Sequence, residues 1–361
     1  MGYNAFAMKK PVAFFVCLLV CLALLAPAYA CAGGGRGANV QPVVVTLAPA
    51  ASPLLSPTLS PSPSLSPTPS PAPSPTLSPA PAPTAAPAPT PFSLLWLSDT
   101  QTMSFRSPLS LLKMGEWVAE NRAQYNILEV VSTGDAVEHG ANPRQWANYD
   151  AMRAYFADLP YFGIAGNHEL GVREKDYAWY LARPDVLSLP PETVFEGGRA
   201  AYRLFSAGGV DFIVLGVGWL SEEDALDWAN GVLETYRDRT AILLFHGVID
   251  SAGRNLKIGK FIVQNYVMPN TNVRLVLCGH VPGSFTRVDE YDLDGDGDAD
   301  HRAILSMYNY QTVGERNGQL RILTFDPAAR TLAITTYSPV TEVFYRENGA
   351  RTPVLVLENA F

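Results

Sequence analysis

Short apolar runs alternate with amphipathic stretches in the middle of the chain. The apolar runs at residues 92–97, 127–131 and 160–165 predict buried strands. Helices are predicted between them, beginning at Ser107-Pro108 and at Asn142-Pro143, where a capping residue precedes a first-turn proline. This order of elements predicts parallel strands joined by right-handed crossovers. The carboxyl ends of these strands should therefore lie along one edge of a sheet.

The pattern changes in the second half of the chain. Residues 201–205 and 210–217 flank an Ala-Gly-Gly turn and predict a hairpin, and a helix is expected to begin at Ser221. Further strands are expected at residues 241–245, 273–278, 303–307, 320–325 and 332–337. The last three lack helical stretches between them, which favours antiparallel pairing. The expected fold class is therefore α/β with mixed sheets.

Polar residues follow five of the predicted strands, and they share a chemistry suited to metal binding. They are Asp99, Asp135, Asn167, His246 and His280. Carboxylate and amide oxygens combined with imidazole nitrogens suit Zn, Fe or Mn better than they suit a calcium cage. Paired ions of this kind can stabilise both the attacking and the leaving oxygen of a phosphoryl transfer.

His168 lies in the segment Gly166-Asn167-His168-Glu169, directly after the third predicted strand. Histidine is the side chain suited to moving a proton near neutral pH. The alternative interpretation of the segment is an ordinary turn, since Asn and Gly are frequent turn residues. The other strand-end residues favour the functional interpretation.

The N-terminus has the order of a signal peptide. Lys9-Lys10 precede an uncharged run from Pro11 to Ala26, and the small residues of Ala28-Tyr29-Ala30 follow it. Residues 1–30 are therefore predicted to direct export, which gives an extracytoplasmic location. Cys31 resembles the cysteine of a bacterial lipobox and would anchor the protein to a membrane through lipid, whereas simple Ala-x-Ala cleavage would give a secreted protein.

Residues 31–91 are predicted to be a glycine tether and a linker. The stretch from Pro42 to Pro91 holds 17 of the 30 prolines and is otherwise mostly Ser, Thr and Ala, so it has too little apolar surface to form a core. Residues 92–361 form the predicted folded domain. All 34 acidic but only 23 of the 26 basic residues follow Pro91, giving this part a net charge of −11. That charge argues against a nucleic-acid-binding surface.

The blocks Asp99-Thr100-Gln101, Gly134-Asp135, Gly166-Asn167-His168-Glu169, His246 and Gly279-His280-Val281-Pro282 match, in order and rough spacing, those of a known family. The domain resembles the calcineurin-like metallophosphoesterases, and in particular exported bacterial members with Asp-Thr-Gln in the first block. The resemblance implies a sandwich of two mixed β-sheets flanked by helices. It also implies hydrolysis of phosphate mono- or diesters by metal-activated water, with two divalent ions.

The resemblance also implies a role for each matching residue. Asp135 would bridge both ions; Asn167, His246 and His280 would complete one site; Asp99 would hold the other ion. His168 would act on the leaving group. Gln101 and Pro282 stand where the family usually has histidine, and both replacements affect the Asp99 site, where Mn or Mg binding through Gln101 is then expected.

These replacements leave two alternatives to the enzyme with a phosphate ester substrate. One is a surface module that keeps the fold and binds metal or phosphate with little turnover. The other is an enzyme whose true substrate is a phosphodiester of the cell envelope. The sequence does not identify the substrate or the oligomeric state.

Three further features carry predictions of their own. The stretch with Asp292, Asp294, Asp296, Asp298 and Asp300 begins like a calcium-binding loop, but Ala303 stands at the position of the final glutamate, so a plain acidic turn between strands is the alternative. His139 lies close enough along the chain to reach substrate or metal, although a surface position is expected. His301 is also expected at the surface.

Overall fold

The computed structural model describes residues 89–311, 316–346 and 354–361. The predicted signal peptide, the lipid attachment site and nearly all of the predicted linker lie outside the described residues. Within the described ranges, no helix is long and apolar enough to cross a membrane.

Seven strands form the first sheet, in the order β13-β12-β11-β1-β2-β3, with β14 also paired to β12. β1, β2 and β3 are parallel, whereas β11 is antiparallel to β1. The parallel strands joined by the predicted crossovers and the antiparallel C-terminal strands therefore belong to one sheet. The bounds are β1 Phe92–Leu97, β2 Ile127–Ser132, β3 Tyr161–Gly163, β11 Leu320–Asp326, β12 Thr331–Ser338, β13 Val343–Tyr345 and β14 Val354–Leu357.

The second sheet also has seven strands, in the order β4-β5-β6-β7-β8-β10-β9. Its central strands β6, β7, β8 and β10 are parallel, and β5–β6 and β9–β10 are antiparallel hairpins. The bounds are β4 Val194–Phe195, β5 Ala200–Ala207, β6 Val210–Val217, β7 Thr240–Phe245, β8 Val273–Cys278, β9 Gly283–Tyr291 and β10 His301–Asn309.

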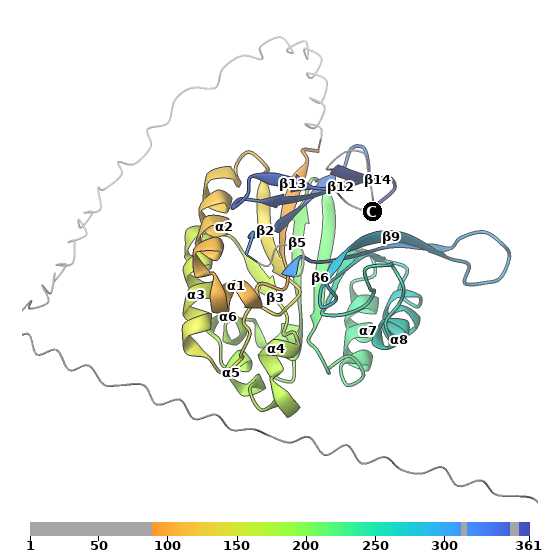
Figure 1. Cartoon of the computed structure of the whole chain (residues 1–361). Coiled ribbons are helices and arrows are strands. Elements are labelled where there is room, and N and C mark those ends of the chain that lie inside the picture. The colour runs from red at the N-terminus through yellow and green to blue at the C-terminus, as the bar shows by residue number, and fades with distance from the viewer. Residues whose placement is uncertain (1–88, 312–315, 347–353) are drawn as a thin grey trace, which may run out of the picture. The chain divides into compact units, whose positions relative to one another are not determined.

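The helices cover the outer faces of the two sheets, with α2 and α3 on one side and α7 and α8 on the other (Figure 1). Their bounds are α1 Gln101–Arg106, α2 Pro108–Asn121, α3 Pro143–Arg153, α4 Asn167–Leu170, α5 Tyr177–Leu181, α6 Pro184–Leu187, α7 Leu226–Thr235 and α8 Lys257–Ile262. Short 3-10 segments span Ala154–Phe156, Val172–Glu174 and Pro191–Thr193, and a π-helical turn spans Val263–Val267.

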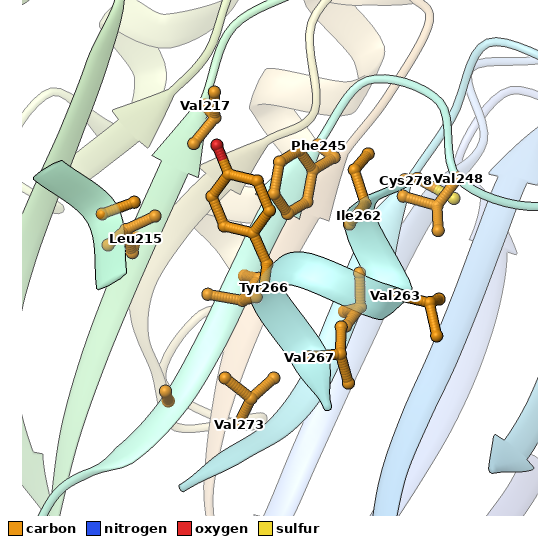
Figure 2. Packing of buried hydrophobic residues seen from close by; sticks show 14 of the residues in the cluster. Leu215, Val217, Phe245, Val248, Ile262, Val263, Tyr266, Val267, Val273 and Cys278 are labelled. Atoms are coloured by element: carbon orange, nitrogen blue, oxygen red, sulfur yellow. The ribbon is translucent and has the colours of Figure 1, made fainter. Parts of the chain in front are cut away.

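Apolar side chains fill three layers. Between the sheets, Leu94 and Trp96 of β1 pack with Val214 of β6 and Leu244 of β7. A second layer joins the first sheet to α2 and α3. A third joins the second sheet to α7, α8 and the π-helical turn, where Tyr266 lies among buried aliphatic side chains (Figure 2). The predicted sandwich of two mixed sheets flanked by helices is confirmed.

One local prediction differs from the structure. Ser221 makes no capping hydrogen bond, and α7 begins at Leu226 after a turn. Asn167 lies in the segment for which an ordinary turn is the alternative interpretation, and it begins the one-turn helix α4. In contrast, Asn142 caps α3 as predicted, because its side chain accepts hydrogen bonds from the amides of Arg144 and Gln145.

An ion pair connects the two sheets away from their apolar centre. Glu129 of β2 is 2% exposed, and its Oε1 lies 3.4 Å from Nε of Arg203 in β5. Burial raises the pKa of Glu129 to about 7, although the Arg203 charge lowers it. The folded protein therefore disfavours the charged carboxylate at neutral pH.

We expect Glu129→Gln to stabilise the protein at high pH. Because the folded-state pKa is raised, the wild type should lose stability as pH rises from about 4.5 to above 7, by on the order of 3 kcal/mol. The variant should have a free energy of unfolding higher by on the order of 3 kcal/mol at pH 8, and the difference should vanish near pH 4. Urea unfolding at both pH values measures this effect.

Arg203→Met provides the opposite change, since it removes the cation that offsets the burial of Glu129. It should destabilise the protein at pH 8 and have little effect near pH 4. Equal effects of either variant at both pH values would contradict this account of the pair.

Candidate metal centre

The predicted site residues gather at the carboxyl ends of the central strands, and both sheets contribute. Asp99, Asp135 and Asn167 follow β1, β2 and β3, whereas His246 and His280 follow β7 and β8. Backbone hydrogen bonds connect the turns in pairs. The amide of Asp99 donates to Gly134 O at 3.1 Å, and the amide of Gly279 donates to His246 O at 2.8 Å.

Three of these residues have a left-handed backbone. The φ angles of Asp99, Asp135 and His280 are 52°, 54° and 67°. Such a conformation costs roughly 1 kcal/mol for a residue with a Cβ, and it clusters at functional sites. The turns therefore hold these side chains at the strand ends in an orientation that an extended backbone would not give.

Close packing around the turns explains their glycines. A Cβ on Gly166 would lie 2.2 Å from Asp135 Oδ1, and a Cβ on Gly279 would lie 2.0 Å from Asp99 Oδ2. Gly134 has a φ of 93°, which favours glycine whatever the space. These glycines allow the backbone to approach the carboxylates.

Four side chains converge at the centre of the site. Asn167 Oδ1 lies 2.8 Å from His280 Nδ1 and 3.0 Å from His246 Nε2. Asp135 Oδ2 lies 3.2 Å from His246 Nε2. Donor atoms of Asp135, His246 and His280 are within 4.8 Å of one another, so they could hold one ion.

The arrangement around His246 requires a positive charge. Its Nδ1 lies 2.8 Å from Thr133 O, which can only accept a hydrogen bond, so Nδ1 carries the proton in the neutral ring. Nε2 then directs a lone pair at two acceptor oxygens. Burial lowers the pKa of His246, but the Asp135 carboxylate outweighs it and raises the pKa to about 10. A positive charge at this place, whether a proton or a metal ion, would satisfy the cluster.

The charge of His246 also shifts the pKa values of Asp135 and His280. Burial opposes ionisation of Asp135, but the charge of His246 lowers the pKa of Asp135 overall. Burial and repulsion from His246 lower the pKa of His280 to about 4, so this imidazole is neutral and can bind a metal. One carboxylate, one amide oxygen and two imidazoles therefore fit a transition metal.

Asp99 lies beside this cluster with a different set of partners. Its carboxylate accepts hydrogen bonds from Ser98 Oγ, the His280 amide and Asn309 Nδ2 at 2.6–3.1 Å. Burial raises the pKa of Asp99 to about 7, and the nearby charge of Asp135 also raises it.

Gln101 is buried between the turn that carries Asp99 and the turn that carries Asp135. Its Nε2 donates to Asp135 Oδ2 at 3.2 Å, and its Oε1 has no hydrogen-bond partner among the described residues. An unpartnered buried acceptor beside Asp135 fits a weak oxygen ligand at a second ion. The residues predicted for that site thus supply oxygen donors and no imidazole, because Pro282 replaces the histidine.

His168 stands at the open side of the cluster. Its Nδ1 is 3.0 Å from Glu138 O, which holds a proton on Nδ1, and its Nε2 lies 3.9 Å from Asp135 Oδ2. Burial lowers its pKa, but Asp135 and Glu138 outweigh that effect and raise it. Nε2 can therefore donate a proton to a group held beside Asp135.

A buried carboxylate connects the two turns that carry Asp135 and Asn167. Glu169 is fully buried and accepts hydrogen bonds from the amides of Gly166, Asp135, Ala136 and Val137 at 2.7–3.2 Å. Burial and the charge of Asp135 raise its pKa, whereas the amides lower it. Glu169 is part of a motif in the sequence, but its position gives no sign of this supporting role.

Two other residues of the site were not predicted. The Trp219 ring lies 4.7 Å from the His280 ring at 35° and 5.4 Å from the His246 ring at 85°, so it restricts both imidazoles. Asn309, at the end of β10, donates to Asp99 Oδ1 and to His280 O. A polar residue ending a buried strand was the available sign for Asn309, and the sequence offers none for Trp219.

The remaining candidates lie elsewhere. His139 is exposed beside His168 and contacts Phe105. The surface prediction for His301 is wrong: it is 2% exposed, and its Nε2 lies 2.7 Å from Val273 O. It cannot replace a missing ligand, since it begins β10 at the end remote from Asn309.

The acidic stretch forms the tip of the β9–β10 hairpin, which extends from the domain (Figure 1). Asp292, Asp294 and Asp300 lie close enough to share an ion, whereas Asp296 and Asp298 are outside that group. Several of these carboxylates accept hydrogen bonds from amides of the same turn. Calcium binding at this tip stays a prediction.

The fold and the strand-end site define a metallophosphoesterase-type domain. The chain belongs to the calcineurin-like phosphoesterase family, whose model matches residues 92–284. The predicted family is therefore confirmed, and this family depends on two metal ions.

One curated relative and several solved structures are similar to the chain. The uncharacterized protein YvnB of Bacillus subtilis is 35% identical over 256 residues, a match that covers 69% of this chain and 20% of YvnB. The purple acid phosphatase PPD1 from yellow lupin seeds has a TM-score of 0.49 at 12% identity, covering 71% of this chain and 53% of that chain. The NAD nucleotidase NadN of Haemophilus influenzae has a TM-score of 0.41 at 13% identity, covering 71% and 49%.

We expect Glu169→Gln to weaken both the fold and the metal centre. The amide NH₂ cannot accept hydrogen bonds, so some of the four backbone amides would lose their acceptor, at a cost of about 2–4 kcal/mol in unfolding free energy. The turns of Asp135 and Asn167 would also lose their connection, which should weaken zinc binding at least tenfold. Urea unfolding and competition with a zinc chelator measure the two effects.

Glu138→Gln is the matched control, because its carboxylate is partly exposed and accepts no backbone hydrogen bond in the described structure. It should change the unfolding free energy by less than about 0.5 kcal/mol. Wild-type zinc affinity in a folded Glu169→Gln variant would show that Glu169 does not position the ligands.

Proposed function

We propose that this chain is a metal-dependent phosphoesterase that hydrolyses phosphate mono- or diesters. The observation that carries the proposal is the convergence of Asp135, Asn167, His246 and His280 on one point that requires a positive charge. Membership of the calcineurin-like phosphoesterase family supports the same reaction class.

Asp135, Asn167, His246 and His280 would hold the first ion, and Asp99 and Gln101 would hold the second together with Asp135. Bound divalent ions would supply Lewis acidity toward the phosphoryl oxygens and lower the pKa of water. Gln101 is a weaker donor than imidazole for such ions, so Mn or Mg is the expected occupant of the second site, and Mn, Zn or Fe that of the first.

The chain's own proton donor in this proposal is His168. The hydrogen bond of His168 Nδ1 to Glu138 O orients Nε2 toward Asp135 Oδ2, beside which the substrate would bind. From Nε2 it would donate a proton to the leaving oxygen or stabilise its charge. The ligand side chains are buried on the side that faces the core, so water is excluded there. The side on which His168 lies is open.

A second candidate function is a binding module with little turnover. Gln101 and Pro282 favour it, because both replace histidines at the same ion. For either function, the N-terminal segment supports export, either with a lipid anchor on Cys31 in a bacterial membrane or as a secreted protein after simple cleavage.

The expected metal content distinguishes the two sites. Protein dialysed extensively should retain about one tightly bound ion, and hydrolysis of aryl phosphate mono- or diesters should rise when Mn or Mg is added. Asp135→Asn should abolish activity, since it removes a ligand of both ions. Asp99→Asn should mainly raise the metal concentration needed for half-maximal rate. Metal analysis and a substrate panel assayed with Mn, Zn, Fe and Mg measure these outcomes.

Asp158→Asn is the matched control for charge. Its carboxylate is exposed and pairs with Arg122 on the surface, so activity and metal content should not change. Two ions retained through dialysis would contradict the weak second site. Absence of turnover with every metal and ester would favour the binding module.

A further inference from the structure

A cavity of about 540 Å³ opens beside His168. Its volume lies within the range of small-molecule pockets, about 300–1,000 Å³. It is lined by Glu138, His139, Asn167, His168, Gly171, Val172, Lys175 and Asp176. Because both Asn167 and His168 face it, the cavity is continuous with the candidate metal centre on the side of the proposed proton donor.

The position of His168 indicates which part of the substrate would occupy this cavity. In a phosphoryl displacement the attacking and leaving oxygens are roughly in line, so the leaving group departs on the side away from the attacking water. His168 would act on the leaving oxygen. The remainder of the leaving group would then extend past His168 into the cavity.

Lys175 is the one lysine or arginine that lines this cavity in the described part of the chain. No described residue forms a hydrogen bond or ion pair with its ammonium group. The neighbouring cation Arg199, in contrast, pairs with Glu174 at 3.2 Å. Lys175 is therefore an exposed cation at the wall of the pocket, and no described residue forms an ion pair with it.

The backbone before Lys175 is strained. Arg173 and Glu174 have φ angles of 57° each, and neither is glycine. Two consecutive left-handed residues cost roughly 1–2 kcal/mol each, and such strain clusters at ligand-binding segments. Amide hydrogen bonds from Gly171 to Asn167 O and from Asp176 to Leu170 O hold the segment against α4. The strained segment thus keeps Lys175 at the cavity beside the metal ligands.

We infer that the cavity binds the leaving group of the substrate and that Lys175 selects phosphate esters whose leaving group carries its own negative charge, such as a carboxylate or a second phosphate. The inference rests on the proposed function for the direction of the leaving group. Glu138 and Asp176 also line the cavity and repel an anion placed beside them, so the selection applies to a leaving group whose negative charge reaches Lys175.

Binding of non-hydrolysable analogues to the metal-loaded protein tests the inference without turnover. The probes are 4-carboxyphenylphosphonate and its methyl ester, which differ by one negative charge at the far end of the ring. Wild type should bind the carboxylate about threefold to fivefold more tightly at low salt, as expected of an accessible ion pair, and the preference should shrink at high salt. Isothermal titration calorimetry measures both affinities.

Lys175→Gln should abolish the preference, and Lys175→Arg should retain most of it. Lys113→Gln is the matched control, because Lys113 is an exposed lysine of α2 outside the cavity and its replacement changes the net charge equally. A wild type without preference, or a Lys175→Gln variant that keeps it, would overturn the inference. The corresponding phosphate esters, assayed in parallel, test the proposed function separately, since failure of hydrolysis leaves the binding comparison valid.

Discussion

The buried carboxylate of Glu169 is the constraint on which the site depends. Turns at the ends of β2 and β3 must bring Asp135 and Asn167 to the same nitrogen of His246, at 3.2 and 3.0 Å, yet their own backbone amides are buried and need acceptors. Glu169 supplies these acceptors for both turns at once. A buried polar group without a partner is costly, so a single side chain that satisfies four amides fixes the two turns relative to each other.

The cost of this arrangement is an accumulation of negative charge. Asp99, Asp135 and Glu169 are all buried, and burial raises the pKa of each or opposes its ionisation. The charge of His246 is the compensation within the described chain. Buried acceptor oxygens and imidazoles in a site of low dielectric constant are stabilised by a bound cation, because the cation compensates their negative charge. The charge balance of the fold is in this way linked to metal binding.

Much of the fold could be predicted from the sequence because its strands are short, continuous apolar runs. The ranges predicted for β1 and β8 match the structure, and the polar residues after the parallel strands converge as expected. Antiparallel pairing of β1 with β11, more than 200 residues later, had no local signature, because pairing depends on the whole sheet.

Several site features could not be predicted, for physical reasons that differ. Trp219 reaches the imidazoles from a loop whose path is set by the hydrogen bond that its backbone amide donates to Ala165 O. The Ser221 pattern resembles a helix cap, but the helix begins later because the chain first turns near the site. Lys175 follows left-handed residues that are not glycine, so composition gives no sign of its backbone. His301 is buried by packing against Tyr291 of the neighbouring strand.

Anomalous X-ray diffraction from crystals soaked in zinc and then in manganese tests the central claim most directly, because it locates each ion. The account predicts a strong zinc peak bounded by Asp135, Asn167, His246 and His280. It also predicts a weaker manganese peak beside Asp99 and Gln101. Absence of a peak among the four ligands, or peaks confined to the acidic tip at residues 292–300, would contradict the account.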